Sequence, residues 1–156
     1  MAVDPELIHL VGIRILRAHF EVNESIIDEP LNISDFQIGL KSESGFNYDD
    51  NAVRFRLFVK IVAKDDKKEL MGVFGEYLLE YNYVVENLND FVEEEVEGKS
   101  VSSMLGATIA GISYSTARGI ILDRTQATDF NGVLLPVIDP HRLLGEDSFS
   151  ELEQVD

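Results

Sequence analysis

Residues 100–127, SVSSMLGATIAGISYSTARGIILDRTQA, are the stretch that decides the expected fold. At about 3.6 residues per turn they form one long helix with two apolar stripes. One stripe is bulky and suits the face of a β-sheet: Leu105, Ile109, Ile112 and Ile120. The other is small and lets a second helix approach closely: Ser103, Gly106, Ala107, Ala110, Gly111 and Ala117.

Two interpretations of the small stripe are open. It packs against a second subunit, or the helix is a core helix buried on both sides within one subunit. We favour the first, because few other helices are expected to cover that face. The sequence therefore predicts an oligomer interface at Gly106, Ala110 and Ala117.

Composition limits the classes of function. The 156 residues, of which 45% are hydrophobic, suffice for one globular domain. Thirteen Lys and Arg against 29 Asp and Glu give a net charge of −16, which repels nucleic acid and anionic membranes. No apolar run approaches the roughly 20 residues that span a bilayer. Acidic Asp4 and Glu6 stand where a signal peptide needs positive charge, so we expect a cytoplasmic protein without membrane insertion.

Strands dominate the first half of the chain. Residues 52–64 and 69–85 alternate apolar and polar side chains, as half-buried antiparallel strands do. Glu76 and Glu80 fall on the polar face, where they can meet basic residues of the preceding strand and set its register. Weaker patterns predict strands at residues 12–22 and 33–40, with a polar turn at 41–51.

The remaining segments complete the expected fold. Residues 86–98 form an acidic loop or short helix, and Asp139-Pro140 begins a short helix as N-cap and first-turn proline. Strands grouped before helices predict an α+β domain: a roughly four-stranded antiparallel sheet with a long and a short C-terminal helix on one face. Residues 1–144 form this single domain, and residues 145–156 form an acidic, mobile tail.

Catalytic patterns are absent from the sequence. The three histidines share no metal-ligand spacing, there is no cysteine, and no nucleophile-elbow, P-loop or dinucleotide motif occurs. We therefore expect no enzyme activity, no catalytic residue, no metal and no cofactor. Apolar residues, in contrast, exceed what one sheet and one helix can hide, which favours oligomerisation, a binding groove, or both.

Several motifs, in order, resemble the SecB family of protein-export chaperones. These are the strand ending in Phe20-Glu21, a crossover reaching Pro30, the VFGEYLLEYNYVV strand, Tyr114 with Ala117-Arg118, and Pro136-Val137 before a short helix. The chain departs from the family at Gly119, usually acidic, and in lacking the arginine-glycine-aromatic-proline turn after the long helix. It is similar to a diverged member.

The resemblance implies a homotetramer, a dimer of dimers, that holds unfolded preproteins without ATP and hands them to a SecA-type ATPase. By position, Glu21 and Glu76 match the family's acidic docking residues, although Arg17 falls where the family tends to be acidic. For the client groove we expect six apolar residues: Ile26, Ile27, Leu31, Phe36, Leu143 and Leu144.

Alternatives remain at this stage. Ile26 and Ile27 can instead fold back onto the core. A solitary SecB-like chaperone can serve one dedicated client, such as an antitoxin. The third possibility is a small-molecule-binding α+β domain with a closed apolar pocket, for which a buried Arg118 would be the signature.

Overall fold

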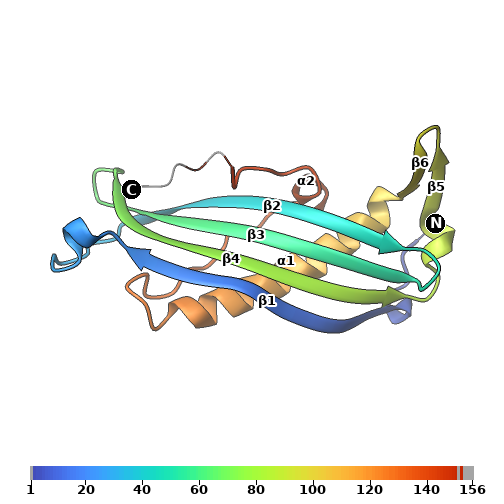
Figure 1. Cartoon of the computed structure of the whole chain (residues 1–156), viewed down its shortest axis with the longest axis horizontal. Coiled ribbons are helices and arrows are strands. Elements are labelled where there is room, and N and C mark those ends of the chain that lie inside the picture. The colour runs from blue at the N-terminus through green and yellow to red at the C-terminus, as the bar shows by residue number, and fades with distance from the viewer. Residues whose placement is uncertain (1, 151, 153–156) are drawn as a thin grey trace.

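A twisted four-stranded antiparallel sheet forms the body of the protein (Figure 1). The computed structural model describes residues 2–150 and 152. The strands are β1 (Ile8–Val22), β2 (Asp35–Asn47), β3 (Ala52–Lys64) and β4 (Leu70–Val85), in the order β1-β4-β3-β2. With helices α1 (Ser103–Thr125) and α2 (Pro140–Leu143), they confirm the expected α+β class.

The two strands with clear alternation match their predicted bounds closely, whereas β1 and β2 are longer than predicted. β2 runs on to Asn47 because its polar segment, KSESGFN, still pairs with β3 along its whole length. A sequence with the composition of a loop is held as a strand here by its neighbour's hydrogen bonds. β1 begins at Ile8, four residues earlier than predicted.

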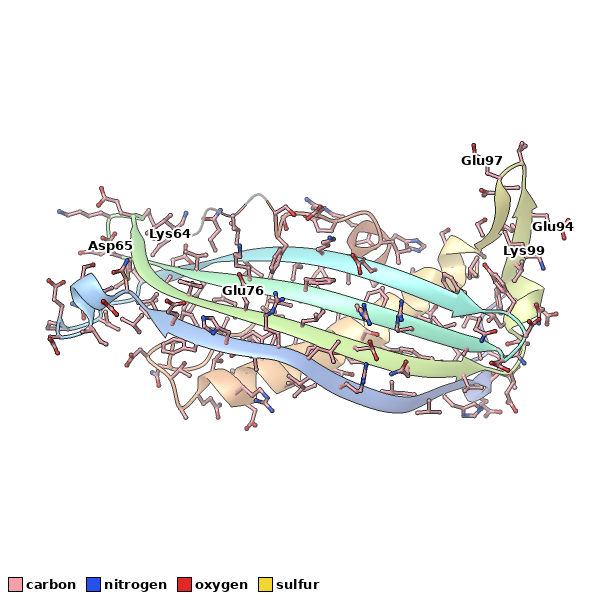
Figure 2. All side chains as sticks on the ribbon, in the orientation of Figure 1. Lys64, Asp65, Glu76, Glu94, Glu97 and Lys99 are labelled. Carbon is pink, nitrogen blue, oxygen red and sulfur yellow. The ribbon has the colours of Figure 1, made fainter. Side chains whose placement is uncertain are left out.

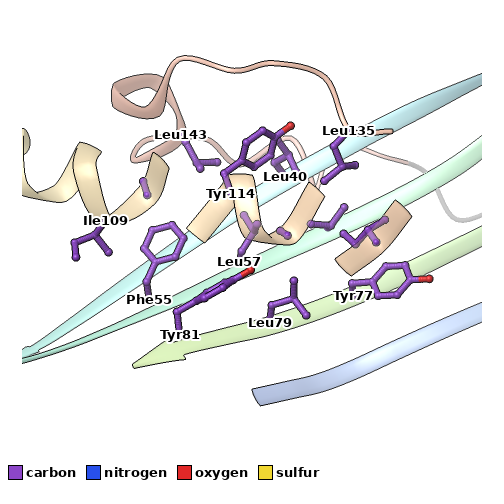
Figure 3. Close-up of a cluster of buried hydrophobic side chains, with 14 of the residues drawn as sticks. Leu40, Phe55, Leu57, Tyr77, Leu79, Tyr81, Ile109, Tyr114, Leu135 and Leu143 are labelled. Atoms are coloured by element: carbon purple, nitrogen blue, oxygen red, sulfur yellow. The ribbon is translucent and has the colours of Figure 1, made fainter. Parts of the chain in front are cut away.

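Helix α1 lies across one face of the sheet, behind it in Figure 1. Leu105 and Ile109 of the bulky stripe meet odd-numbered residues of β3 and β4 in a buried core (Figure 3). Ile112 and Ile120 of that stripe lie outside the core, and Ile112 is 37% exposed. Ser102 caps the helix by accepting a hydrogen bond from Met104 N at 3.3 Å. Among the described residues, no helix lies on the other face of the sheet, which we call the open face.

The small stripe of α1 is covered by the chain itself. Leu144 lies over Gly106 and Pro140 over Gly111, at distances that leave little room for added side chains. Ala110 and Ala117 have no exposed surface. These small residues thus let the segment after α1 pack closely, and the inference of a second subunit at Gly106, Ala110 and Ala117 is corrected, because the chain itself covers them. The helix is not buried on all sides, since Ser115 and Gly119 are exposed.

Side chains of α1 also hold that segment in place. Tyr114 Oη donates to the carbonyl of Pro136, and Arg118 Nε donates to the carbonyl of Leu135 at 2.9 Å. The segment then enters α2, where Asp139 accepts from His141 N at 3.0 Å, which confirms the predicted N-cap. Residues 133–138, which include Pro136, do not form a strand of the sheet.

An acidic hairpin stands where a loop or short helix was predicted. After a 3₁₀ turn at Leu88–Phe91, β5 (Val92–Glu95) and β6 (Gly98–Val101) pair with each other and project away from the sheet (Figures 1 and 2). Glu94 lies opposite Lys99, and Gly98 has φ +135°, a value that only glycine adopts easily.

The C-terminal segment returns to the sheet. Asp147 forms a β-bridge with Lys41 of β2, and Leu152 is 8% exposed. Glu151 and residues 153–156 of the predicted tail lie outside the described residues, so its mobility stays a prediction. Across the described ranges, no helix is both long enough and apolar enough to span a bilayer.

Candidate functional site

A cleft of about 710 Å³ opens at the end of the sheet where β3 turns into β4. Three segments far apart in sequence surround it: residues 30–36 between β1 and β2, the β3–β4 turn with Met71, and residues 129–131 after α1. The sheet, the crossover and the end of the long helix thus each supply one side.

Phe130 forms the apolar centre of the cleft. Its ring makes edge-to-face contacts with Phe36, at 5.5 Å between centroids, and with Phe20, at 4.8 Å. Gly75 makes room for it, because a side-chain carbon there would lie 3.2 Å from the Phe130 ring. The turn that presents the ring has Asn131 and Gly132 at positive φ, 55° and 93°, as the Asn-Gly dipeptide favours.

Acidic residues line the rim of the cleft: Asp65, Asp66 and Asp129. Asp65 also shapes the turn, since its Oδ1 accepts from the backbone nitrogens of Lys67 and Glu69 at 2.8 and 3.0 Å. An apolar floor with an acidic rim favours a ligand with apolar and basic groups.

Two of the predicted groove residues, Leu31 and Phe36, line this cleft. Ile26 and Ile27 lie in the neighbouring crossover but outside the lining. Ile26 packs on the core near Gly72, which supports the alternative that it folds back, whereas Ile27 is 62% exposed.

Leu143 and Leu144 require a correction, because neither lines this cleft. Leu143 is fully buried between α1 and the sheet (Figure 3), and its carbonyl accepts from Ser42 Oγ at 2.9 Å. Leu144 covers Gly106. The sequence indicated their apolar character but not which surface would cover them.

Phe130 and Met71 are cleft residues that the sequence did not identify. A usable signal existed for Phe130: it directly precedes the Asn131-Gly132 turn, so it sits at a fixed corner after the helix. Met71 follows the β3–β4 turn and is indistinguishable in sequence from any strand residue.

Exposed apolar side chains occur in two further places. On β1, Leu10, Val11, Ile13, Ile15 and Leu16 are 38–63% exposed. On the segment beside α1, Leu134 and Val137 are 63% and 85% exposed. Neighbouring exposed apolar side chains on a highly charged chain often mark a site of interaction.

The open face carries rows of alternating charge. Glu80, whose side chain is 4% exposed, bonds Arg14 of β1 and Arg56 of β3, both at 2.9 Å. Glu76 lies 3.3 Å from Arg17 and 3.7 Å from Lys60 (Figure 2). The register pairs Glu80 with Arg56 and Glu76 with Lys60, which confirms the predicted cross-strand pairing.

Burial alone would raise the pKa of Glu80, but hydrogen bonds from Arg56, Asn82 and Arg14 outweigh it and hold the pKa below its ordinary value. The carboxylate is therefore ionised and neutralised by its partners. Glu76 is similarly flanked by cations, and Glu21 Oε2 lies 2.9 Å from His19 Nε2. Neither predicted docking residue presents an isolated negative charge to a basic partner.

Arg118 does not form an anion site. Its Nε is engaged by the Leu135 carbonyl, and the hollow that it lines with Tyr114 and Val137 measures only about 110 Å³. Among residues 2–150 and 152, no group of His, Cys, Asp or Glu is arranged to hold a metal ion.

Comparisons with known proteins give a likeness of fold. No family model matches the sequence, and no curated protein matches it either. The SecB-like chaperone Rv1957 of Mycobacterium tuberculosis, solved in complex with a peptide from the HigA1 antitoxin, covers 85% of this chain. The match spans 91% of that chain, with a TM-score of 0.53 and 13% sequence identity.

A protein of unknown function from Streptococcus agalactiae also aligns, with a TM-score of 0.36, 11% identity, and 83% of this chain and 97% of that one covered. That score is too low to support an argument. The four-stranded sheet, the long helix beneath it and the alignment with Rv1957 together show that this chain has a distant SecB-like fold.

Proposed function

We propose that this chain is an ATP-independent chaperone that holds unfolded polypeptides in the cleft between the crossover, the β3–β4 turn and Phe130. The observation that carries the proposal is the cleft's construction: half-buried Phe36 packs against the nearly buried ring of Phe130, and acidic residues form the rim. Such a site suits an extended apolar segment with basic residues.

Binding energy in this proposal comes from apolar burial at roughly 25 cal/mol per Å², before the client's ordering cost. This term does not depend on side-chain identity beyond apolar character. The cleft is therefore suited to many unfolded clients, and Leu134 and Val137 can extend the apolar contact beyond it.

Aggregation of a slowly folding client, followed by light scattering, tests the proposal. The wild-type chain is expected to suppress aggregation, and Leu31→Glu, which places an acid inside the cleft, to abolish suppression. Ile27→Glu is the matched control: it adds the same charge in the same crossover, outside the lining. Equal loss of suppression in both variants, or no suppression by the wild type, would refute the cleft as the client site.

A homotetramer, a dimer of dimers, is part of the proposal. The apolar residues of β1 support it, as does the outward face of α1, where Thr108, Ser115 and Gly119 carry no charge and Gly119 faces open space. Light scattering is expected to give four times the chain mass of 17.5 kDa. A monomer over micromolar concentrations would reject it.

A second candidate is a chaperone dedicated to one client. Rv1957, whose fold this chain shares, was solved with a peptide from an antitoxin, and that observation favours a single short segment as the ligand. Suppression of only one among a panel of unrelated unfolded clients would select this candidate over the general one.

Docking to a SecA-type ATPase at Glu21 and Glu76 remains a prediction, and the cations Arg17 and Lys60 beside Glu76 weigh against it. Co-sedimentation with such an ATPase tests it. Binding to the ATPase that is lost in Glu21→Gln would support this prediction, and binding that is unchanged in that variant would contradict it.

A further inference from the structure

The β2 edge of the sheet already displays a mode of peptide binding. Residues 147–150 and Leu152 of the chain's own C-terminal segment lie against it, on the edge and the open face, away from the cleft. Phe149 N donates to the carbonyl of Leu40 at 3.1 Å, and Leu40 N donates to Ser148 Oγ at 2.9 Å. The segment satisfies backbone groups that an edge strand otherwise exposes.

Phe149 turns onto the open face. Its ring lies 6.0 Å from the ring of Phe58 in a near-perpendicular contact, and Lys60 Nζ lies 4.7 Å from its centroid. Lys60 is 6% exposed, with Glu76 on its other side at 3.7 Å. Lys60 is thus held between a carboxylate and this ring. We call the surface on which the segment lies, formed by Gly39, Leu40, Phe58 and Lys60, the seat.

Gly39 indicates that the seat is shaped for this segment. A side-chain carbon at Gly39 would lie 2.8 Å from both Leu152 Cδ1 and the carbonyl of Ser148. Gly39 is not among the glycines with positive φ, so backbone conformation does not require glycine there. The absent side chain is what admits Ser148 and Leu152.

Charge complements this shape. On the open face, arginines and lysines outnumber acids: Arg14, Arg17, Lys41, Arg54, Arg56, Lys60 and Lys64 against Glu21, Asp35, Glu43, Glu76 and Glu80. The C-terminal sequence GEDSFSELEQVD has acids and no basic residue. The face therefore carries more basic than acidic residues in a protein whose net charge is −16, and the described segment that lies against it brings the acidic Asp147.

We propose that the β2 edge and the adjoining open face form a docking site for an acidic partner segment carrying a phenylalanine and a leucine three residues apart, in the pattern Asp-Ser-Phe-x-x-Leu. The chain's own residues 147–150 and Leu152 occupy the site until such a segment displaces them. The site lies on the opposite face from the cleft and does not depend on the chaperone proposal.

A tethered occupant lowers the apparent affinity for a free segment by the fraction of molecules in which the seat is empty. A variant in which the C-terminal segment no longer lies on the seat, while the seat itself is unchanged, is therefore expected to bind a free segment more tightly. Phe149→Ala/Leu152→Ala is such a variant, because both residues belong to the occupant and neither to the seat.

Fluorescence anisotropy with a labelled peptide, GEDSFSELEQVD, tests the proposal on full-length protein. The double variant is expected to bind at least tenfold more tightly than the wild type, with affinity falling as salt is raised. Val96→Ala, an exposed apolar residue in the turn of the β5–β6 hairpin, is the matched control and should bind like the wild type. Adding Gly39→Val to the double variant should abolish binding by filling the seat.

Peptide controls keep the test decisive if Gly39→Val fails to fold. A peptide with Phe and Leu replaced by Ala, and one with every acid replaced by Lys, must both fail to bind the double variant. Equal affinity for wild type and double variant, or binding of either control peptide, overturns the proposal. Exchange of tails between two copies without binding of free peptide overturns it as well.

Discussion

The two edge strands of the sheet differ in how far the chain itself covers them. β2 is covered by the chain itself: α2 lies beside it, Ser42 bonds the Leu143 carbonyl, and the C-terminal segment bridges Lys41. β1 has a partner on one side only, and five of its large apolar residues are well exposed. Bare edge strands invite association, so the contrast supports the proposals that β1 takes part in assembly and that β2 binds short segments.

Irregularities sharpen this contrast. β1 slips in register against β4 between Leu10 and Gly12 and again between Ile15 and Arg17, which leaves Val11 and Leu16 as extra residues. Both are exposed. Bulges often protect an edge by bending it. Here they add apolar side chains to the edge instead, as an interface requires.

The largest effect is expected from charging β1. Ile13→Glu/Ile15→Glu places acids on the apolar edge of an already acidic chain, and the proposed assembly should fall apart into smaller species by light scattering. Gln37→Glu/Ser44→Glu adds the same charges to β2, where both positions are exposed, and should leave the mass unchanged. The reverse result would assign assembly to β2.

Leu143 is expected to anchor α2 beside β2. Leu143→Ala should lower the free energy of unfolding by about 2–5 kcal/mol, because a fully buried leucine leaves a cavity between α1 and β2. Val137→Ala, 85% exposed on the same segment, should cost less than about 0.5 kcal/mol. Denaturant unfolding measures both. Similar costs at the two positions would mean that Leu143 is accessible, as the groove prediction required.

Glu80 ties β1 to the rest of the sheet through Arg14 and Arg56, so its loss tests how firmly the bare edge is held. Glu80→Gln should cost about 1–3 kcal/mol at pH 7. Because the folded pKa of Glu80 lies below the ordinary 4.5, its contribution is complete above that pH. The contribution is lost as the pH falls through the lower folded value.

Unfolding of wild type and Glu80→Gln across pH 3–7 is the measurement for this prediction. Their difference should close toward the acidic end. Glu43→Gln is the control, since that carboxylate is exposed and lies 3.4 Å from Lys41 at the surface. A gap that persists unchanged at low pH would mean that the charge of Glu80 contributes nothing.

Local patterns predicted much of the fold. Alternation placed β3 correctly from Ala52 to Lys64, and the Asp139-Pro140 cap placed the start of α2. The pairing of Glu76 and Glu80 with basic residues of β3 was also predictable, because adjacent antiparallel strands of known parity admit few registers. Each of these depends on neighbouring residues alone.

Contacts between segments that are far apart in the sequence could not be predicted. The small stripe of α1 looks the same whether a second helix or the chain's own Leu144 and Pro140 cover it. The acidic composition of the C-terminal segment predicts solvation, yet Phe149 and Leu152 bring it back to the sheet. For the cleft, Leu31 and Phe36 were identified, but Phe130 comes from a turn almost a hundred residues later.

The smallest effect is expected from Gly39→Ala, compared between the wild type and the variant in which the C-terminal segment no longer binds to β2. In the wild type, Gly39→Ala should cost about 1 kcal/mol, because the new methyl group displaces Ser148 and Leu152. With Phe149→Ala/Leu152→Ala already present, the segment is no longer seated and only the usual gain from replacing a strand glycine remains, about 0.4–1 kcal/mol. The sign of the substitution should therefore reverse between the two backgrounds in denaturant unfolding. The same sign in both would mean that Gly39 and the C-terminal segment are not coupled, and that the β2 edge is as bare in solution as β1.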